Sequence, residues 1–178
     1  MRMILVAAAL ALAACTVETT APTLTSGDAA GGYTLELFAA NDAQVYRITT
    51  PDGAVVAAQA SGDASMMTPA TEVQGFFESM PAAPRPEEAD VAIRLPGVDL
   101  RVAGQKGGAT DQARISINVA GKEVLINAED NGVEGDQDTG QARIRITGAD
   151  ADAARDFIAD ADGLSEEVKA QLRTAAGL

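Results

Sequence analysis

Short segments of alternating apolar and polar residues make up most of the chain from residue 33 onward. They predict β-strands, because successive side chains of a strand point to opposite faces. The connectors between these segments are polar or as short as hairpin turns, such as Pro51-Asp52-Gly53, and this favours antiparallel pairing. We therefore predict about seven or eight strands, in hairpins and a meander, in a mainly antiparallel sheet. The strand-forming segments are YTLELFA, QVYRITT, GAVVAAQA, VAIRL, VDLRV, ARISINV, KEVLIN and ARIRIT.

Apolar residues at helical spacing predict one helix in the middle of the chain and a pair of helices at the C-terminus. Residues 61–69 predict a loop, at the end of which Thr68 would cap the middle helix. The first C-terminal helix is expected over residues 149–162, and Ser165 is expected to cap the second. Sheet and helices together predict the fold class α+β, with residues 33–178 as a single domain.

Two patterns suggest which side chains lie inside. In the last strand segment, alternation predicts that Ile144 and Ile146 face inward and that Arg143 and Arg145 face solvent. In the middle helix, Phe76 and Phe77 belong to one apolar stripe. A sheet this poor in aromatic residues favours both rings as core, but the same stripe could form an exposed partner-binding face, and both interpretations stay open.

The longest apolar run, residues 4–14, has no amphipathic face and follows the basic Arg2. Its 11 residues are too few to span a bilayer, which needs about 20. A basic start, an apolar segment of this length and small residues at its end are typical of a secretory signal peptide. Ala11-Leu12-Ala13 fits an ordinary cleavage site, whereas Leu12-Ala13-Ala14-Cys15 resembles the lipobox of bacterial lipoproteins.

The lipobox resemblance covers residues 1–15 and implies a lipid-anchored protein of the cell envelope. In that family cleavage precedes the cysteine, so residues 1–14 would be removed and acylated Cys15 would hold the chain to the lipid bilayer. Thr16 stands where aspartate marks inner-membrane retention in enterobacterial lipoproteins. We expect the outer membrane, facing the periplasm, with the inner membrane or cell surface as alternatives. Residues 15–32, rich in small and polar residues, predict a flexible tether.

Charge and composition narrow the function. The chain has 13 basic and 26 acidic residues, for a net charge of −13, which becomes −14 when Arg2 is removed with the signal peptide. A nucleic-acid partner needs a basic footprint, so none is expected. The chain has no His and a single Cys, so a thiol nucleophile would lack its usual base. We expect a non-enzymatic binding or structural accessory domain, with an envelope protein as the candidate partner.

One acidic loop offers other chemistry. Asp130, Glu134, Asp136 and Asp138 lie within residues 128–140, and Ca²⁺ prefers six to eight oxygen ligands. A calcium-binding module is therefore an alternative, although the spacing does not match an EF-hand and a solvated loop is favoured. No other cofactor is expected. A hydrolase using two carboxylates is a further alternative, because such pairs form in space rather than in sequence.

Overall fold

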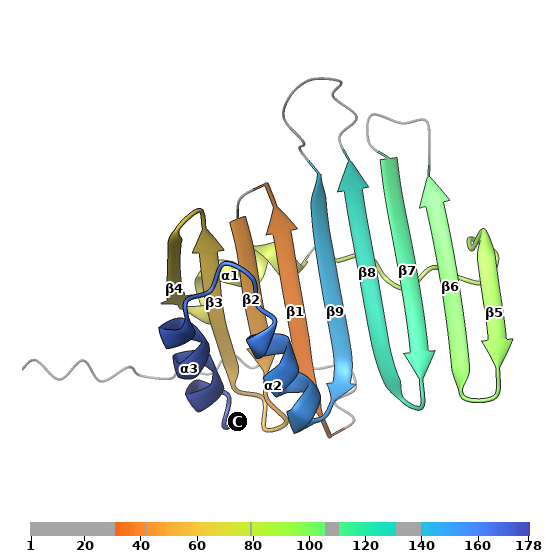
Figure 1. Cartoon of the computed structure of the whole chain (residues 1–178). Coiled ribbons are helices and arrows are strands. Elements are labelled where there is room, and N and C mark those ends of the chain that lie inside the picture. Colours follow the sequence, from red (N-terminus) through yellow and green to blue (C-terminus); the bar gives the residue numbers. More distant parts are fainter. Residues whose placement is uncertain (1–30, 42, 79, 106–110, 131–139) are drawn as a thin grey trace, which may run out of the picture.

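A computed structural model describes residues 31–41, 43–78, 80–105, 111–130 and 140–178 (Figure 1). Within these residues the chain forms one nine-stranded antiparallel sheet and three helices, which confirms a mainly antiparallel α+β fold. The strand count is nine, so the prediction of seven or eight was wrong. The elements are β1 (Tyr33–Ala40), β2 (Ala43–Thr49), β3 (Val55–Ser61), β4 (Ala64–Thr68), α1 (Ala70–Glu78), β5 (Val91–Leu95), β6 (Val98–Gln105), β7 (Asp111–Val119), β8 (Lys122–Asp130), β9 (Gln141–Ala149), α2 (Ala151–Ala159) and α3 (Glu166–Ala175).

The strand order is β4-β3-β2-β1-β9-β8-β7-β6-β5, so the first and last strands of the chain are neighbours near the middle of the sheet. β1 and β9 pair from Ala40 opposite Gln141 to Tyr33 opposite Ala149, with one register shift next to Tyr33. All other neighbours are consecutive in sequence and form hairpins or a meander. The β1–β9 pair therefore joins two sequential halves, β4 to β1 and β9 to β5, into one sheet.

β4 lies inside the segment that was predicted as a loop. It pairs with β3 along its whole length, through a turn in which Gly62 has φ +54°. Thr68 is the last residue of this strand rather than a helix cap, so that prediction was wrong. Its buried hydroxyl has no hydrogen-bond partner among the described residues. In the first turn of α1 the Glu72 amide instead donates to the Pro69 carbonyl, at 3.0 Å.

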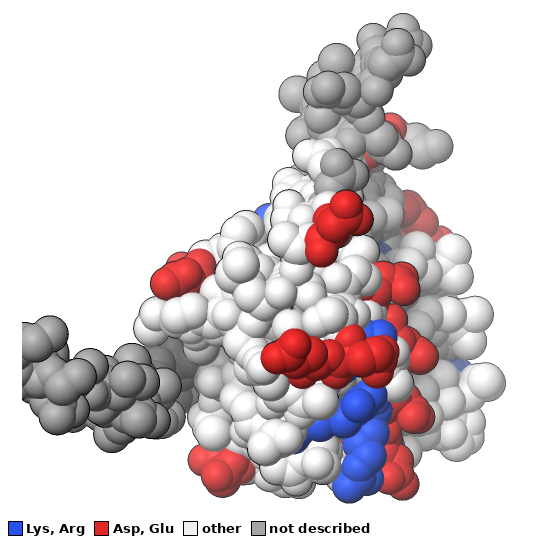
Figure 2. Space-filling view, turned by 60° about the vertical axis from the view of Figure 1, so that its left-hand side comes forward, with Lys and Arg blue, Asp and Glu red and all other residues white. Residues whose placement is uncertain are grey.

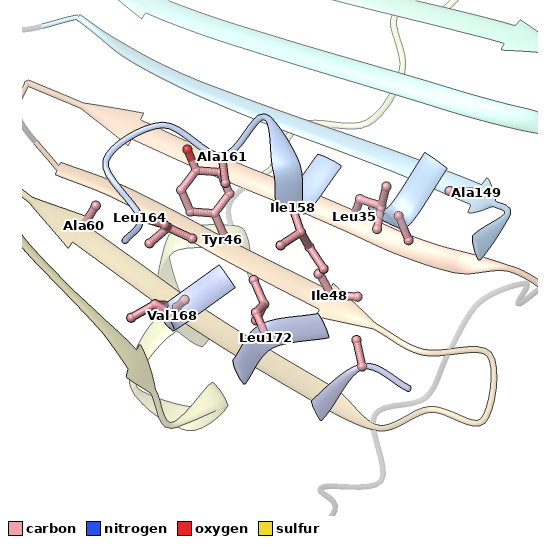
Figure 3. Close-up of a cluster of buried hydrophobic side chains, with 13 residues drawn as sticks. Leu35, Tyr46, Ile48, Ala60, Ala149, Ile158, Ala161, Leu164, Val168 and Leu172 are labelled. Atoms are coloured by element: carbon pink, nitrogen blue, oxygen red, sulfur yellow. The ribbon is translucent and has the colours of Figure 1, made fainter. Parts of the chain in front are cut away.

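The main core lies between the β4–β1 half of the sheet and the helices α2 and α3, which cover one face of it (Figures 1 and 3). Leu35 and Ile48 from the strands and Ile158 and Leu172 from the helices are all at most 1% exposed. Ser165 caps α3 as predicted, its hydroxyl accepting a hydrogen bond from the Val168 amide. This core holds the helix pair firmly over one half of the sheet.

Tyr46 connects the sheet to the turn between α2 and α3. Its ring is 3% exposed and meets the Phe157 ring edge-on, with centroids 5.8 Å apart. Its hydroxyl lies 3.0 Å from the Asp162 carbonyl oxygen and also within reach of the Gln44 side chain. Burial, with a smaller contribution from the Asp162 charge, raises the pKa of Tyr46 from 10.0 to about 12. The phenol therefore stays neutral in the folded protein well above neutral pH.

Helix α1 packs on the opposite face of the same half of the sheet. Val73 and Phe77, each 1% exposed, contact Phe38, Val45 and Ala57. The helices thus cover both faces of the β4–β1 half. After α1, the connector to β5 runs behind the remaining strands, on the α1 side (Figure 1).

Candidate functional site

The face that carries α2 and α3 is uncovered over strands β8 to β5 and over much of β9, where Ile146 and Ala149 border the main core; none of the described helices or connectors packs on the rest (Figure 1). Paired residues of antiparallel strands share a face. One row of paired residues therefore continues the main core across the sheet. It runs from Leu35 through Ile146, Val124 and Ile117 to Leu100. We call the valine, isoleucine and leucine side chains on this side of β5 to β9 the open aliphatic face. Its members are Val91, Ile93, Leu95, Val98, Leu100, Val102, Ile115, Ile117, Val119, Val124, Ile126, Ile144 and Ile146. By the same pairing, Ala113, Ala128 and Ala142 lie on this side too, with Lys122 at one end and Asp111 and Asp130 at the other.

The open aliphatic face is large for a surface patch. Leu95 is 63% exposed, and Val91, Ile93 and Val119 are between 44% and 48% exposed. Five strands about 4.8 Å apart, each contributing about five to seven residues at about 3.4 Å per residue, give a projected area of roughly 400–500 Å². Contiguous apolar patches of this size lie at the upper end for monomers and mark interaction sites. This face is therefore the strongest candidate for a binding surface.

Charged side chains lie at the border of this face and on the helices. Lys122 Nζ at the start of β8 lies 2.6 Å from Asp150 Oδ2 at the start of α2. The hydrogen bond from Lys122 holds the pKa of Asp150 below its usual value. On the side turned forward in Figure 2, acidic side chains are spread among uncharged ones, and the basic side chains lie beside acidic ones. The open aliphatic face thus differs in chemistry from the helix-bearing side.

The opposite face of the sheet carries a buried ion-pair cluster beneath α1. Glu36 is 1% exposed and accepts hydrogen bonds from Arg47 and, at 2.7 Å, from Arg145. The Arg47 guanidinium also lies 4.5 Å from the centre of the Phe77 ring, a cation–π contact. Burial without this pairing would cost several kcal/mol for each charge, which explains why the groups are so closely associated.

Two arginines of β9 hold the C-terminal end of α1. Arg143 Nε donates to the Phe76 carbonyl at 3.0 Å, and Arg145 Nη2 donates to the Phe77 carbonyl at 3.3 Å. Cations are favourable there because the last carbonyls of a helix are unpaired and its dipole is negative. The prediction that these arginines face solvent was wrong, since Arg143 is only 9% exposed. The cluster attaches α1 to the sheet, and all the side chains named in it are engaged within the fold.

The two phenylalanines proposed as a partner-binding face lie in different environments. Phe77 is 1% exposed and belongs to the α1 core. Phe76 is 38% exposed, and its ring lies 4.8 Å from that of Phe38, tilted by 33°. Only Phe76 therefore reaches the surface, and it does so on the face opposite the open aliphatic face.

Three of the four proposed metal ligands lie outside the described residues: Glu134, Asp136 and Asp138. The lipidation residue Cys15 lies outside them too. Asp130 ends strand β8, where it pairs with Asp111 of β7. Among the described residues no group of three or more potential ligands is placed to hold a metal ion.

A hollow beside the β5–β6 turn is lined by polar and apolar residues of β5, β6 and the β7–β8 turn. It contains one carboxylate, Asp99, which pairs with Arg101 at 2.6 Å and with Arg94 at 3.4 Å. The hydrogen bond from Arg101 is the main cause of the lowered pKa of Asp99. A carboxylate mechanism needs two acids about 5–9.5 Å apart. This hollow does not supply the second acid.

Comparison of the chain with protein-family models, curated proteins and solved structures found no match. In the part of the chain that the structure describes, no helix has the length and apolar character to cross a membrane. The sequence contained the signal for the open aliphatic face, as alternating Ile, Leu and Val residues in five strands, but a side was predicted only for the last of them, where the isoleucines were expected to face inward.

Proposed function

We propose that this protein is a lipid-anchored protein of the cell envelope whose folded domain is a non-enzymatic binding module. The observation that carries the proposal is the open aliphatic face of β5 to β9. Covering roughly 400–500 Å² of apolar surface is worth on the order of 10 kcal/mol before the costs of association are subtracted. A binding partner for this face would therefore gain substantially from contact with it.

The N-terminal segment supports the same proposal. Acyl chains on Cys15 would contribute about 0.8 kcal/mol for each buried CH₂ group, so the domain needs no apolar surface of its own to stay at the membrane. A flexible tether over residues 16–32 has a root-mean-square span of roughly 20–25 Å. The open aliphatic face is therefore available for a partner other than the anchoring bilayer.

Replacing Cys15 by serine tests the anchor. Without the sulfur that accepts the diacylglycerol, we expect Cys15→Ser to lose membrane association and to run as unprocessed or soluble protein. The measurement is fractionation of cells into membrane and soluble parts, followed by intact mass. A variant with the mass and membrane distribution of the wild type would refute lipid attachment at Cys15.

Thiol labelling tests the binding surface. Ile117→Cys puts a thiol at the centre of the open aliphatic face, and Asn118→Cys puts one on the other side of the same strand, where Asn118 is exposed. In isolated native membranes we expect a bulky maleimide to label Asn118→Cys but not Ile117→Cys, because a partner covers that face. The wild type is the control for background reaction at Cys15. Equal labelling of both variants in membranes would show the face to be free and would contradict the proposal.

A further inference from the structure

We infer that the partner of the open aliphatic face is a second copy of this chain, packed sheet against sheet; this inference rests on the proposed binding function of that face. The shape of the molecule is the first argument. α2 and α3 form a layer about 10–12 Å thick on one half of the sheet and leave the other half bare. Two sheets packed face to face lie about 10 Å apart. A second sheet laid on the bare half would therefore be level with the helix layer.

Symmetry gives the second argument, because, of the two-fold axes along and across the strands, the helix layer permits only the axis along them. A two-fold axis parallel to the strands and above β7, the middle strand of the bare half, places β7 over β7, β6 over β8 and β5 over β9. The helices of each copy then lie beyond the β5 edge of the other copy. A two-fold axis that runs across the strands, in the plane between the two sheets, would instead place each strand over its own copy. The helices of one copy would then lie on those of the other and hold the two aliphatic faces apart.

The same axis suits two chains anchored in one membrane. Rotation about an axis parallel to the strands keeps corresponding strand ends on the same side. The two copies of Tyr33, which begins β1 next to the tether, therefore lie at one end of the dimer. Both tethers can then reach the same bilayer, and confinement to that bilayer raises the effective concentration of one copy near another.

The chemistry of the face favours a copy of itself over a lipid surface. Its thirteen members are valine, isoleucine and leucine, residue types that interdigitate in the core of a β-sandwich. Binding to a bilayer surface usually uses Trp, Tyr and basic residues. The chain has no Trp, its two tyrosines pack against the helix-covered half, and its net charge is −13.

The area that two such faces would bury is close to what a stable dimer needs. Two faces of roughly 400–500 Å² bury about 800–1,000 Å² in total, which approaches the usual lower limit of about 1,000 Å² for a specific interface. Contact between each β5 edge and the helices of the other copy adds to it. Because two chains of equal negative charge repel each other, added salt should strengthen the association by screening that repulsion.

Cross-linking in native membranes tests the dimer. Val119 is the last residue of β7 and lies near the proposed axis, so two copies of a cysteine there come close together at the edge of the interface rather than at its centre. We expect a short bis-maleimide to convert Val119→Cys into a species of twice the monomer mass. Asn118→Cys, on the opposite side of the strand, should remain monomeric under the same conditions. Equal cross-linking of the two variants would indicate random collision and would overturn the dimer.

A charge introduced at the far edge of the interface provides a second test. Ile93 is 45% exposed in a single copy, so Ile93→Glu should leave the fold intact but place a carboxylate against β9 of the other copy. We expect it to abolish cross-linking of Val119→Cys. The matched variant Ala92→Glu, an exposed neighbour on the opposite face, should keep it. Cross-linking that survives Ile93→Glu would show that the two copies do not meet through this face.

The labelling and cross-linking results together separate the two proposals. If Val119→Cys forms no cross-linked dimer while Ile117→Cys is still protected, a different partner covers the face. That result overturns the dimer and keeps the binding function. Absence of a dimer with Ile117→Cys fully labelled would overturn both.

Discussion

Replacing Glu36 by alanine is expected to lower the free energy of unfolding by about 3–5 kcal/mol, because removing one member of a buried ion pair leaves charge unpaired in the interior. Glu36 is 1% exposed and accepts hydrogen bonds from both Arg47 and Arg145. In the variant these two guanidinium groups would face each other without the carboxylate between them. Urea unfolding followed by circular dichroism measures the loss.

An exposed ion pair on α2 is the control for this experiment. Asp152, whose side chain is 92% exposed, pairs with Arg155 one turn later at 2.8 Å. Exposed pairs are worth about 0–1 kcal/mol, since water already solvates both charges. We therefore expect Asp152→Ala to change the free energy of unfolding by less than about 1 kcal/mol. A loss in Glu36→Ala no larger than this would show that the cluster does not hold α1 on the sheet.

Truncating Phe77 should have an effect of similar size. Phe77 fills the space between α1 and the sheet and is 1% exposed, and Phe to Ala changes at such sites cost about 3–5 kcal/mol. The adjacent Phe76 is 38% exposed and stacks on Phe38, so Phe76→Ala should cost about 1 kcal/mol. The two variants compared by urea unfolding separate the core residue from its surface neighbour.

Phe76→Ala also tests which face binds. Phe76 lies on the α1 side of the sheet, opposite the open aliphatic face. In an Ile117→Cys background, Phe76→Ala should therefore leave the protection of the thiol in membranes unchanged. Loss of protection without loss of stability would instead place Phe76 in the binding surface, as the sequence pattern first allowed.

Local patterns predicted most of the secondary structure. Alternation in segments such as YTLELFA and the apolar spacing in α2 and α3 depend on neighbouring residues only, and so they can be recognised in one sequence. β4 was missed because its sequence, ASMMT, does not alternate clearly and its strand conformation comes from pairing with β3. The wrong prediction for Thr68 has the same cause, because the end of the missed strand was interpreted as a helix cap.

The β9 strand shows a different limit of sequence reasoning. Alternation correctly separated Arg143 and Arg145 from Ile144 onto opposite faces. It could not say which face is covered, because the covering element, α1, lies more than 60 residues earlier in the chain. The structure places the arginines beneath α1 and leaves much of the aliphatic side open, the reverse of the simple rule that apolar residues face inward.

The sequence by itself determined the lipobox resemblance at Cys15, the antiparallel strands and the α+β class, because each depends on residues close together in the chain. Only the tertiary structure decided that β1 pairs with β9, that Glu36 is buried between two arginines, and that all three helices lie over one half of the sheet. These features depend on contacts between distant segments, and the open aliphatic face exists because none of the described segments covers it.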